Sequence, residues 1–267
     1  MKRSLAIVIL AAAFVGMLGA AAVADTLIGT DGGDDLRGTP GPDQFYGEGG
    51  DDRLAGAGSP DYLEAGSGDD EVHGEEGVDL AIGGTGDDGI DAGTEGDVVY
   101  AGAGEDLVLG GTGADTLFGQ ADSDRLFGGP GPDRVYASLG SDYVDAGSGD
   151  DRVISDQGDV TVSAGAGDDA VAAAGGEVDV QGGGGNDRIR TGDFADQVTG
   201  GPGRDSIATG GGDDVVRAGD GQRDRVECGA GAGDAVDADR LDTLVGCESV
   251  VTPTGRRASL APTAAIR

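Results

Sequence analysis

The sequence has few large side chains and little positive charge. Its 267 residues include no Trp, five Tyr and five Phe, and 17 Lys and Arg stand against 51 Asp and Glu, for a net charge of −34. So few large side chains cannot fill the broad core that a chain of this length would normally bury. The excess of acidic residues argues against nucleic acid and anionic membrane surfaces as partners, and it favours cations.

Recognisable catalytic motifs are also missing. The sequence has no nucleophile–base–acid set, no HExxH and no phosphate-binding Gly-rich loop. Its carboxylates are plentiful, but most fall in a regular turn pattern, so a glycosidase-like pair hidden among them is the weaker interpretation. The sequence therefore predicts a protein without catalytic activity. An extracellular enzyme with an unrecognised site is the alternative.

Glycine, by contrast, is abundant and recurs with a fixed period. Residues 110–118 read Gly-Gly-Thr-Gly-Ala-Asp-Thr-Leu-Phe, and a nine-residue frame that begins at Gly29 runs without insertion to Arg217. In this frame position 1 is small, position 4 is mostly Gly, position 6 is Asp and position 8 is apolar. Such Gly content with high charge would normally suggest disorder. The fixed period instead indicates repeats that stack and bury a narrow continuous core.

The segment 110–118 matches G-G-x-G-x-D-x-U-x, where U is a large apolar residue, and the chain resembles the RTX, or haemolysin-type, calcium-binding repeat family. The resemblance implies an all-β fold, a right-handed parallel β-roll (a β-helix solenoid) of stacked nonapeptide repeats. Six residues of each repeat would form a turn that binds calcium, and three would form a short strand. Because two nonapeptides make one coil, residues 18 apart would stack on each other.

The resemblance assigns calcium to the Asp at position 6. Calcium prefers six to eight oxygen ligands from carboxylates and carbonyls, and strands about 4.8 Å apart would let one ion bridge two turns. Gly-Asp pairs are also good turn formers, but this does not explain an Asp fixed two residues before the apolar position. The predicted ligands are Asp34, Asp43, Asp52, Asp61, Asp70, Asp79, Asp88, Asp97, Asp106, Asp115, Asp124, Asp133, Asp142, Asp151, Asp169, Asp187, Asp196, Asp205 and Asp214.

Alternate repeats would stack on opposite flanks of the roll. The series from Asp43 to Asp205 is unbroken, whereas the series that starts at Asp34 is interrupted by Val160 and Val178. We call these the unbroken and the interrupted series. Around both Val residues polar and apolar residues alternate over five positions, which predicts strands longer than three residues. The sequence therefore predicts a calcium-free patch, held by apolar stacking, on one flank.

Position 9 of the repeats in the unbroken series is expected to form an exposed stripe up one sheet. Its members are Ile82, Tyr100, Phe118, Tyr136 and Ile154. Such a stripe can stabilise neighbouring strands by self-stacking, or it can contact a cell-surface glycan or a second copy of the chain. A calcium-dependent adhesin or polysaccharide-binding protein is therefore an alternative function.

Both ends differ from the repeats. Lys2 and Arg3 precede an apolar run and a small-x-small cleavage pattern, so residues 1–24 are predicted to be a signal peptide rather than a membrane anchor. Residues 25–227 are the predicted roll. Cys228 and Cys247, the only cysteines, are expected to form a disulfide in the exported chain, within a C-terminal cap of residues 228–250. A disordered tail of residues 251–267 is expected to follow.

Together these features predict a secreted, extracellular protein that binds calcium ions. Its roll would fold when calcium binds between stacked turns, since ions that bind only the folded state add their binding free energy to folding. It would serve as a non-catalytic structural or binding module, without a membrane span once the signal peptide is removed.

Overall fold

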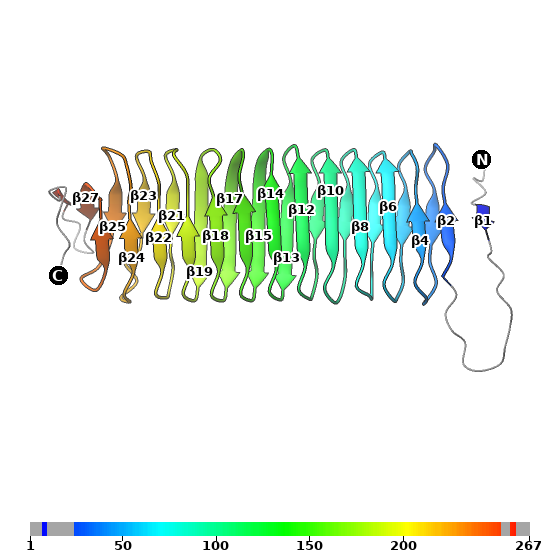
Figure 1. Ribbon diagram of the computed structural model, residues 1–267, viewed down its shortest axis with the longest axis horizontal. Coiled ribbons are helices and arrows are strands. Elements are labelled where there is room, and N and C mark those ends of the chain that lie inside the picture. Colours follow the sequence, from blue (N-terminus) through cyan, green and yellow to red (C-terminus); the bar gives the residue numbers. More distant parts are fainter. Residues whose placement is uncertain (1–6, 10–23, 252–256, 260–267) are drawn as a thin grey trace. The chain divides into compact units, whose positions relative to one another are not determined.

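The computed structural model describes residues 7–9, 24–251 and 257–259. It divides into two compact units, Met1–Gly128 and Gly129–Arg267. The residues in these ranges form strands and turns but no α-helix (Figure 1), and therefore no helix that could cross a membrane.

Within the first unit, successive strands alternate between two parallel sheets, which we call the even and the odd sheet. The even sheet contains β2 (Thr26–Ile28), β4 (Gln44–Tyr46), β6 (Tyr62–Ser67), β8 (Leu80–Thr85), β10 (Val98–Ala103) and β12 (Thr116–Ala121). The odd sheet contains β3 (Asp35–Arg37), β5 (Arg53–Ala55), β7 (Glu71–His73), β9 (Gly89–Asp91), β11 (Leu107–Leu109) and β13 (Arg125–Pro130). β1 (Ile7–Ile9) pairs antiparallel with β2.

The second unit has the same alternation. Its even sheet contains β14 (Arg134–Ser138), β16 (Arg152–Ser155), β18 (Ala170–Ala173), β20 (Arg188–Arg190), β22 (Ser206–Ala208), β24 (Arg225–Glu227) and β26 (Thr243–Val245). Its odd sheet contains β15 (Ser141–Ser148), β17 (Asp159–Ala166), β19 (Val178–Gly184), β21 (Gln197–Thr199), β23 (Val215–Arg217), β25 (Ala235–Asp237) and β27 (Ser249–Val251). β28 (Arg257–Ser259) pairs antiparallel with β27.

The register follows the repeat. Val99 pairs with Ala81 and Leu117, each 18 residues away, and the apolar position-8 residues are buried. Each repeat thus contributes an apolar position-8 side chain, in most repeats Val, Leu or Ile, to a narrow core, as the sequence predicts. The predicted all-β fold, a parallel solenoid of stacked nonapeptides, is confirmed.

The turns are tight and strongly favour Gly at position 4. Gly104 has φ 138°, and a Cβ added there would lie 2.0 Å from the carbonyl oxygen of Gly86 in the stacked turn. Ser59, Glu95 and Asp122, which replace Gly at this position, each adopt φ 74°. These side chains therefore fit the turn, although at a conformational cost of about 1–2 kcal/mol each.

Gly104→Ala is expected to lower the free energy of unfolding by about 2–4 kcal/mol, because it combines a φ that favours Gly with a backbone clash. Gly89→Ala is the matched control, since its nearest contact would be the Asp70 carbonyl oxygen at 3.9 Å. Urea unfolding in saturating calcium measures both. Equal losses for the two variants would contradict this account of the turns.

Near the C-terminus the chain departs from the nine-residue frame without leaving the sheets. Val226 pairs with Ile207, 19 residues away, and Val236 pairs with Val216, 20 residues away. Both sheets continue in this way through residues 228–250, the segment predicted to be a cap. Most of the predicted signal peptide and of the predicted tail lies outside the described residues, although Val251 belongs to β27 and β28 pairs with that strand.

Candidate calcium sites

The position-6 Asp side chains form buried ladders through the turns. All of the predicted ligands are at most 7% exposed. At most rungs the backbone amide of an Asp donates to Oδ1 of the Asp in the next stacked turn: Asp88 donates to Asp106, and Asp151 donates to Asp169, both at 2.8 Å. One oxygen of such a carboxylate therefore links two turns through a hydrogen bond.

The second carboxylate oxygen, Oδ2, is the unusual feature of the ladders. At most interior rungs it is buried and has no hydrogen-bond partner among the described residues. Such atoms belong to Asp52, Asp61, Asp70, Asp79, Asp88, Asp97, Asp106, Asp151, Asp169, Asp187, Asp196, Asp205, Asp214, Asp224 and Asp234. A buried polar atom without a partner costs free energy, so this repeated arrangement suits a cation.

Where position 1 is Gly, a backbone carbonyl lies close to several of these oxygens. A Cβ built on Gly74 would lie 2.6 Å from Oδ2 of Asp79 and 2.2 Å from the carbonyl oxygen of Ala92 in the next turn. At Gly83 the corresponding distances, to Asp88 and Ala101, are 2.4 and 2.5 Å. Position 1 is small because a side chain would fill this space. Oxygens from two stacked turns thus converge, which matches the oxygen ligands that calcium prefers.

Burial also disfavours ionisation of the ladder carboxylates. It raises the pKa of Asp61, Asp88 and Asp97 to about 7, while the backbone hydrogen bond to each carboxylate opposes the increase and neighbouring Asp residues of the ladder add to it. At neutral pH, ionised ladders therefore destabilise the stacked turns unless a cation compensates them.

The ends of the ladders differ from the interior. Oδ2 of Asp34 accepts hydrogen bonds from the Thr30 amide at 2.7 Å and the Thr30 hydroxyl at 2.9 Å, and Oδ2 of Asp242 accepts one from the Asp239 amide at 2.8 Å. The chain itself satisfies these oxygens, so the interior rungs are the better candidates for ions.

The ladders include three Asp residues that the sequence analysis did not assign as ligands. Asp205 donates its amide to Asp224, Asp224 to Asp242, and Asp214 to Asp234, at 2.8, 3.0 and 3.0 Å respectively. They lie beyond the break in the nine-residue frame. Their signal in the sequence is an Asp two residues before a buried apolar residue, as in Asp234-Ala-Val and Asp242-Thr-Leu.

The two Val residues interrupt one ladder, as the sequence predicts. Val160 and Val178 are each 3% exposed and are register neighbours in β17 and β19, strands of eight and seven residues. The predicted lengthening of these strands is confirmed. The amide of Val160 donates to the carbonyl oxygen of Glu177 at 3.2 Å instead of to a carboxylate, so this rung lacks the carboxylate link. That it binds no calcium stays a prediction.

Each unit also has an exposed ladder of carboxylates beside a buried one, with the opposite hydrogen-bond direction. Here a later turn donates to the carboxylate of an earlier turn: Asp69 to Asp51, Asp87 to Asp69, Glu105 to Asp87, and Asp168 to Asp150, at 2.9–3.1 Å. Their signal in the sequence is Gly-Asp-Asp, which recurs at intervals of 18 residues at 50–52, 68–70 and 86–88 and again at 149–151 and 167–169. Because these side chains are exposed, they lack the desolvation that marks the buried ladders.

No group of three or more His, Cys, Asp or Glu side chains in the described ranges converges as a metal site. Calcium held in the ladders would therefore need backbone carbonyls as well as carboxylates, as the convergence at Gly74 and Gly83 suggests. Side-chain clustering alone does not reveal sites of this kind.

The predicted outer stripe is half-buried in both units. In the first unit Tyr100 pairs with Ile82 and Phe118, and the rings of Tyr100 and Phe118 stack with centroids 4.7 Å apart and an angle of 4° between planes. In the second unit Tyr136 pairs with Ile154. Because one face of each stacked ring covers the other ring, this pair supports self-stacking and leaves less ring surface for a sugar.

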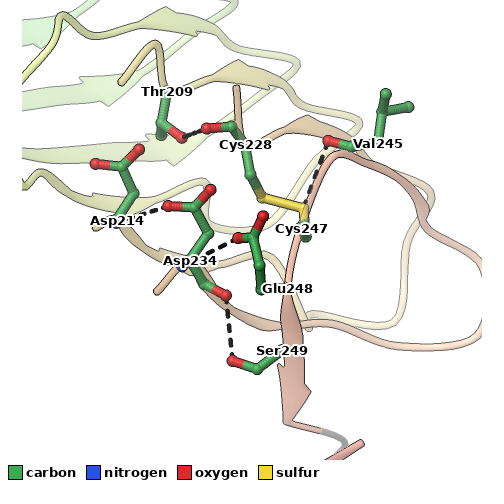
Figure 2. The surroundings of a disulfide bond; sticks show 8 residues. All are labelled: Thr209, Asp214, Cys228, Asp234, Val245, Cys247, Glu248 and Ser249. Carbon is green, nitrogen blue, oxygen red and sulfur yellow. Dashed lines mark hydrogen bonds between the residues drawn. A yellow bond between two sulfur atoms is a disulfide. The ribbon is translucent and has the colours of Figure 1, made fainter. Parts of the chain in front are cut away.

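Cys228 and Cys247 are joined by a disulfide in the structure (Figure 2). Cys228 follows β24 and is fully buried. Its amide donates to the carbonyl oxygen of Val245 at 3.0 Å, and its carbonyl oxygen accepts from the Thr209 hydroxyl at 3.1 Å. The bond therefore ties the last turns together where the frame is irregular.

The double variant Cys228→Ser, Cys247→Ser is expected to lose about 3 kcal/mol of unfolding free energy, because the bond closes a loop of about 20 residues. Denaturant unfolding in calcium, with and without reductant, measures the effect, and the double variant should not respond to reductant. Mass spectrometry that found two free thiols in protein folded under oxidising conditions would contradict the pairing.

Comparison with known proteins identifies the family of this chain. The model of the RTX calcium-binding nonapeptide repeat matches residues 28–177 and 181–223 in overlapping stretches. The chain therefore belongs to this family, and it is a calcium-binding repeat protein that forms a β-solenoid. No curated protein matches the sequence.

Among solved structures, the chain is similar to a hyperactive, Ca²⁺-dependent, β-helical antifreeze protein from an Antarctic bacterium. The two share 19% identity with a TM-score of 0.42, and the match covers 87% of this chain and 95% of the other.

Proposed function

We propose that this chain is an exported, non-catalytic structural or binding module whose solenoid folds when calcium ions bind between stacked turns. The ligands would be the predicted position-6 Asp side chains, extended to Asp224 and Asp234, together with turn carbonyls. The observation that carries the proposal is the row of buried Oδ2 atoms without partners.

The core supports a need for calcium. Each repeat buries one apolar side chain at position 8, often only a Val, with at most a small residue or a second Val beside it. Most of the 57 Gly residues of the chain lie in the repeats, and Gly loses more conformational freedom on folding than other residues. Carboxylates in stacked turns, about 5 Å apart, also repel each other. Calcium removes the repulsion and supplies the missing interactions of Oδ2, so its binding free energy becomes folding free energy.

Export fits the same mechanism. Calcium is abundant outside cells, where sites with dissociation constants on the order of 10⁻⁴–10⁻³ M can fill. With sites this weak, the chain would stay unfolded in the cell and fold after export through the predicted signal peptide.

Far-UV circular dichroism during a calcium titration tests the proposal. At pH 7 the chain should be largely unfolded in chelator and should acquire a β spectrum cooperatively at millimolar calcium. Asp97→Ala removes one rung of a buried ladder and should move the calcium midpoint upward. Asp145→Ala is the matched control, because Asp145 lies at an outward position of β15, and it should leave the midpoint in place. A β spectrum already complete in chelator would show that the core suffices without calcium.

A further inference from the structure

The even sheet of the second unit carries arginines on its outer face. Arg134 and Arg152 are register neighbours on β14 and β16, and Arg188 and Arg190 lie on β20. β18 lies between β16 and β20 and presents only Ala170 and Ala172 at the matching outward positions. Arg152 and Arg188 are two strands apart, a separation of about 10 Å along the sheet.

Three of these arginines border a hollow. Arg152, Arg188 and Arg190 line it, and Ala170 and Ala172, with the backbone of Val171 between them, form its floor. The small side chains of β18 leave space between the longer arginine side chains on either side. The hollow is therefore open to solvent, with cationic walls and an apolar floor.

None of the four arginines forms an ion pair or a side-chain hydrogen bond with a described residue. Elsewhere in the described chain, Arg37, Arg53 and Arg225 are paired with neighbouring acids, whereas Arg125 and Arg217 on odd strands have no ion pair either. In a sequence with 51 acidic and 17 basic residues, unpaired arginines gathered on one face need a reason. Free guanidinium groups favour ligands that bear carboxylate or sulfate groups, which they can bind in bidentate fashion.

We propose that this face, defined by Arg134, Arg152, Arg188 and Arg190, binds an extended anionic polysaccharide that bears carboxylate or sulfate groups. The polymer would lie along the row of arginines, across the strands, so that successive acidic groups meet successive guanidinium groups. A sugar ring would rest on the apolar floor of β18. The proposal depends on the folded solenoid but not on the number of calcium sites.

The width of the face favours a thin polymer. The short strands of this sheet span only about 10–17 Å, and exposed carboxylates flank them: Asp150 and Asp168 precede β16 and β18, and Asp156 follows β16. A bilayer or a second acidic copy of the chain is wider than the sheet and would bring its negative charge against these carboxylates. A single polysaccharide chain can contact the arginines and avoid both edges.

Binding of the full chain in millimolar calcium to immobilised chondroitin sulfate, with neutral dextran as the comparison, tests the proposal. Chondroitin sulfate should bind, dextran should not, and higher salt should weaken the binding. The double variant Arg152→Gln, Arg188→Gln should bind roughly tenfold more weakly, as expected for two exposed charge pairs. The control Arg125→Gln, Arg217→Gln makes the same change of charge at outward positions of odd strands and should keep the wild-type affinity.

Each outcome can be separated from a folding defect, because the calcium-induced circular dichroism change is recorded for every variant. Equal binding by both double variants, or no binding by the wild type, would overturn the proposal. The proposal would also be overturned if chondroitin sulfate did not bind while the chain bound phosphatidylserine vesicles, or self-associated in sedimentation, in a way that depended on Arg152 and Arg188. The first result would assign the face to lipid and the second to another copy of the chain.

Discussion

In the absence of calcium, lowering the pH from 7 to 5 is expected to increase the β structure of the chain. Protons would then neutralise the ladder carboxylates in place of calcium. Burial raises the pKa of Asp61, Asp88, Asp97, Asp169 and Asp224 to about 7 in the folded chain, against an ordinary value of 3.8. The calcium-free folded state therefore binds more protons than the unfolded state between these two values.

The direction of this pH dependence of folding stability follows from proton linkage. For a carboxylate whose pKa rises on folding, the protonated form contributes stability that is fully present below pH 3.8 and is lost as the pH rises through about 7. Several rungs share this behaviour, including Asp79 and Asp205, whose pKa burial raises to about 6. The losses accumulate along each ladder, and the calcium-free fold should be weakest at neutral pH and above.

Far-UV circular dichroism in chelator, followed from pH 8 to pH 5, measures the effect. This range stays above the isoelectric point of about 4.1 and so limits precipitation. The same series in calcium is the control, because bound ions should hold the fold at neutral pH and reverse the trend. A calcium-free chain whose β content did not change between pH 7 and pH 5 would contradict the account of the ladders.

The sequence predicted those features that repeat exactly every nine residues. The alternation of strands and turns, the buried position 8 and the place of the Asp at position 6 in the turn all follow from period and residue class, whereas the burial of that Asp does not. Asp224 and Asp234 were not assigned as ligands because the stacking distance becomes 19 and 20 residues where the frame breaks. Asp242 stacks on Asp224 at the usual 18 residues but lies beyond that break, and only strand pairing shows which turns meet.

Hydrogen-bond direction and surface composition were harder to predict. The sequence does not show that Oδ1 is used by an amide of the adjoining turn while Oδ2 has no partner at the interior rungs, because that depends on atomic positions. The outward positions 7 and 9 vary freely, so Arg152 and Arg188 resemble ordinary surface residues in sequence. Only the stacking of β16, β18 and β20 shows that they share one hollow.

Restoring the interrupted ladder with two Asp residues is expected to destabilise the chain without calcium and to add calcium sites that offset this loss when calcium is present. In the double variant Val160→Asp, Val178→Asp, two buried apolar side chains become carboxylates beside Asp142 and Asp196. Without calcium at pH 7, each new group would be a buried charge without a cation, costing about 1–3 kcal/mol or more. With calcium, adjacent Asp rungs would run from 142 through 160 and 178 to 196, enough for about three further ions.

The measurements are calcium stoichiometry by isothermal titration calorimetry and thermal unfolding at several calcium concentrations. The variant should bind more calcium than the wild type, unfold at a lower temperature when calcium is scarce, and recover that loss when calcium is saturating. Val160→Asn, Val178→Asn is the matched control: it buries polar groups of similar size without the charge, so it should be less stable at every calcium concentration with unchanged stoichiometry. If the Asp variant, like the Asn control, bound no more calcium than the wild type, stacked Asp rungs alone would not make a site. The position-6 carboxylates would then lose their assignment as ligands.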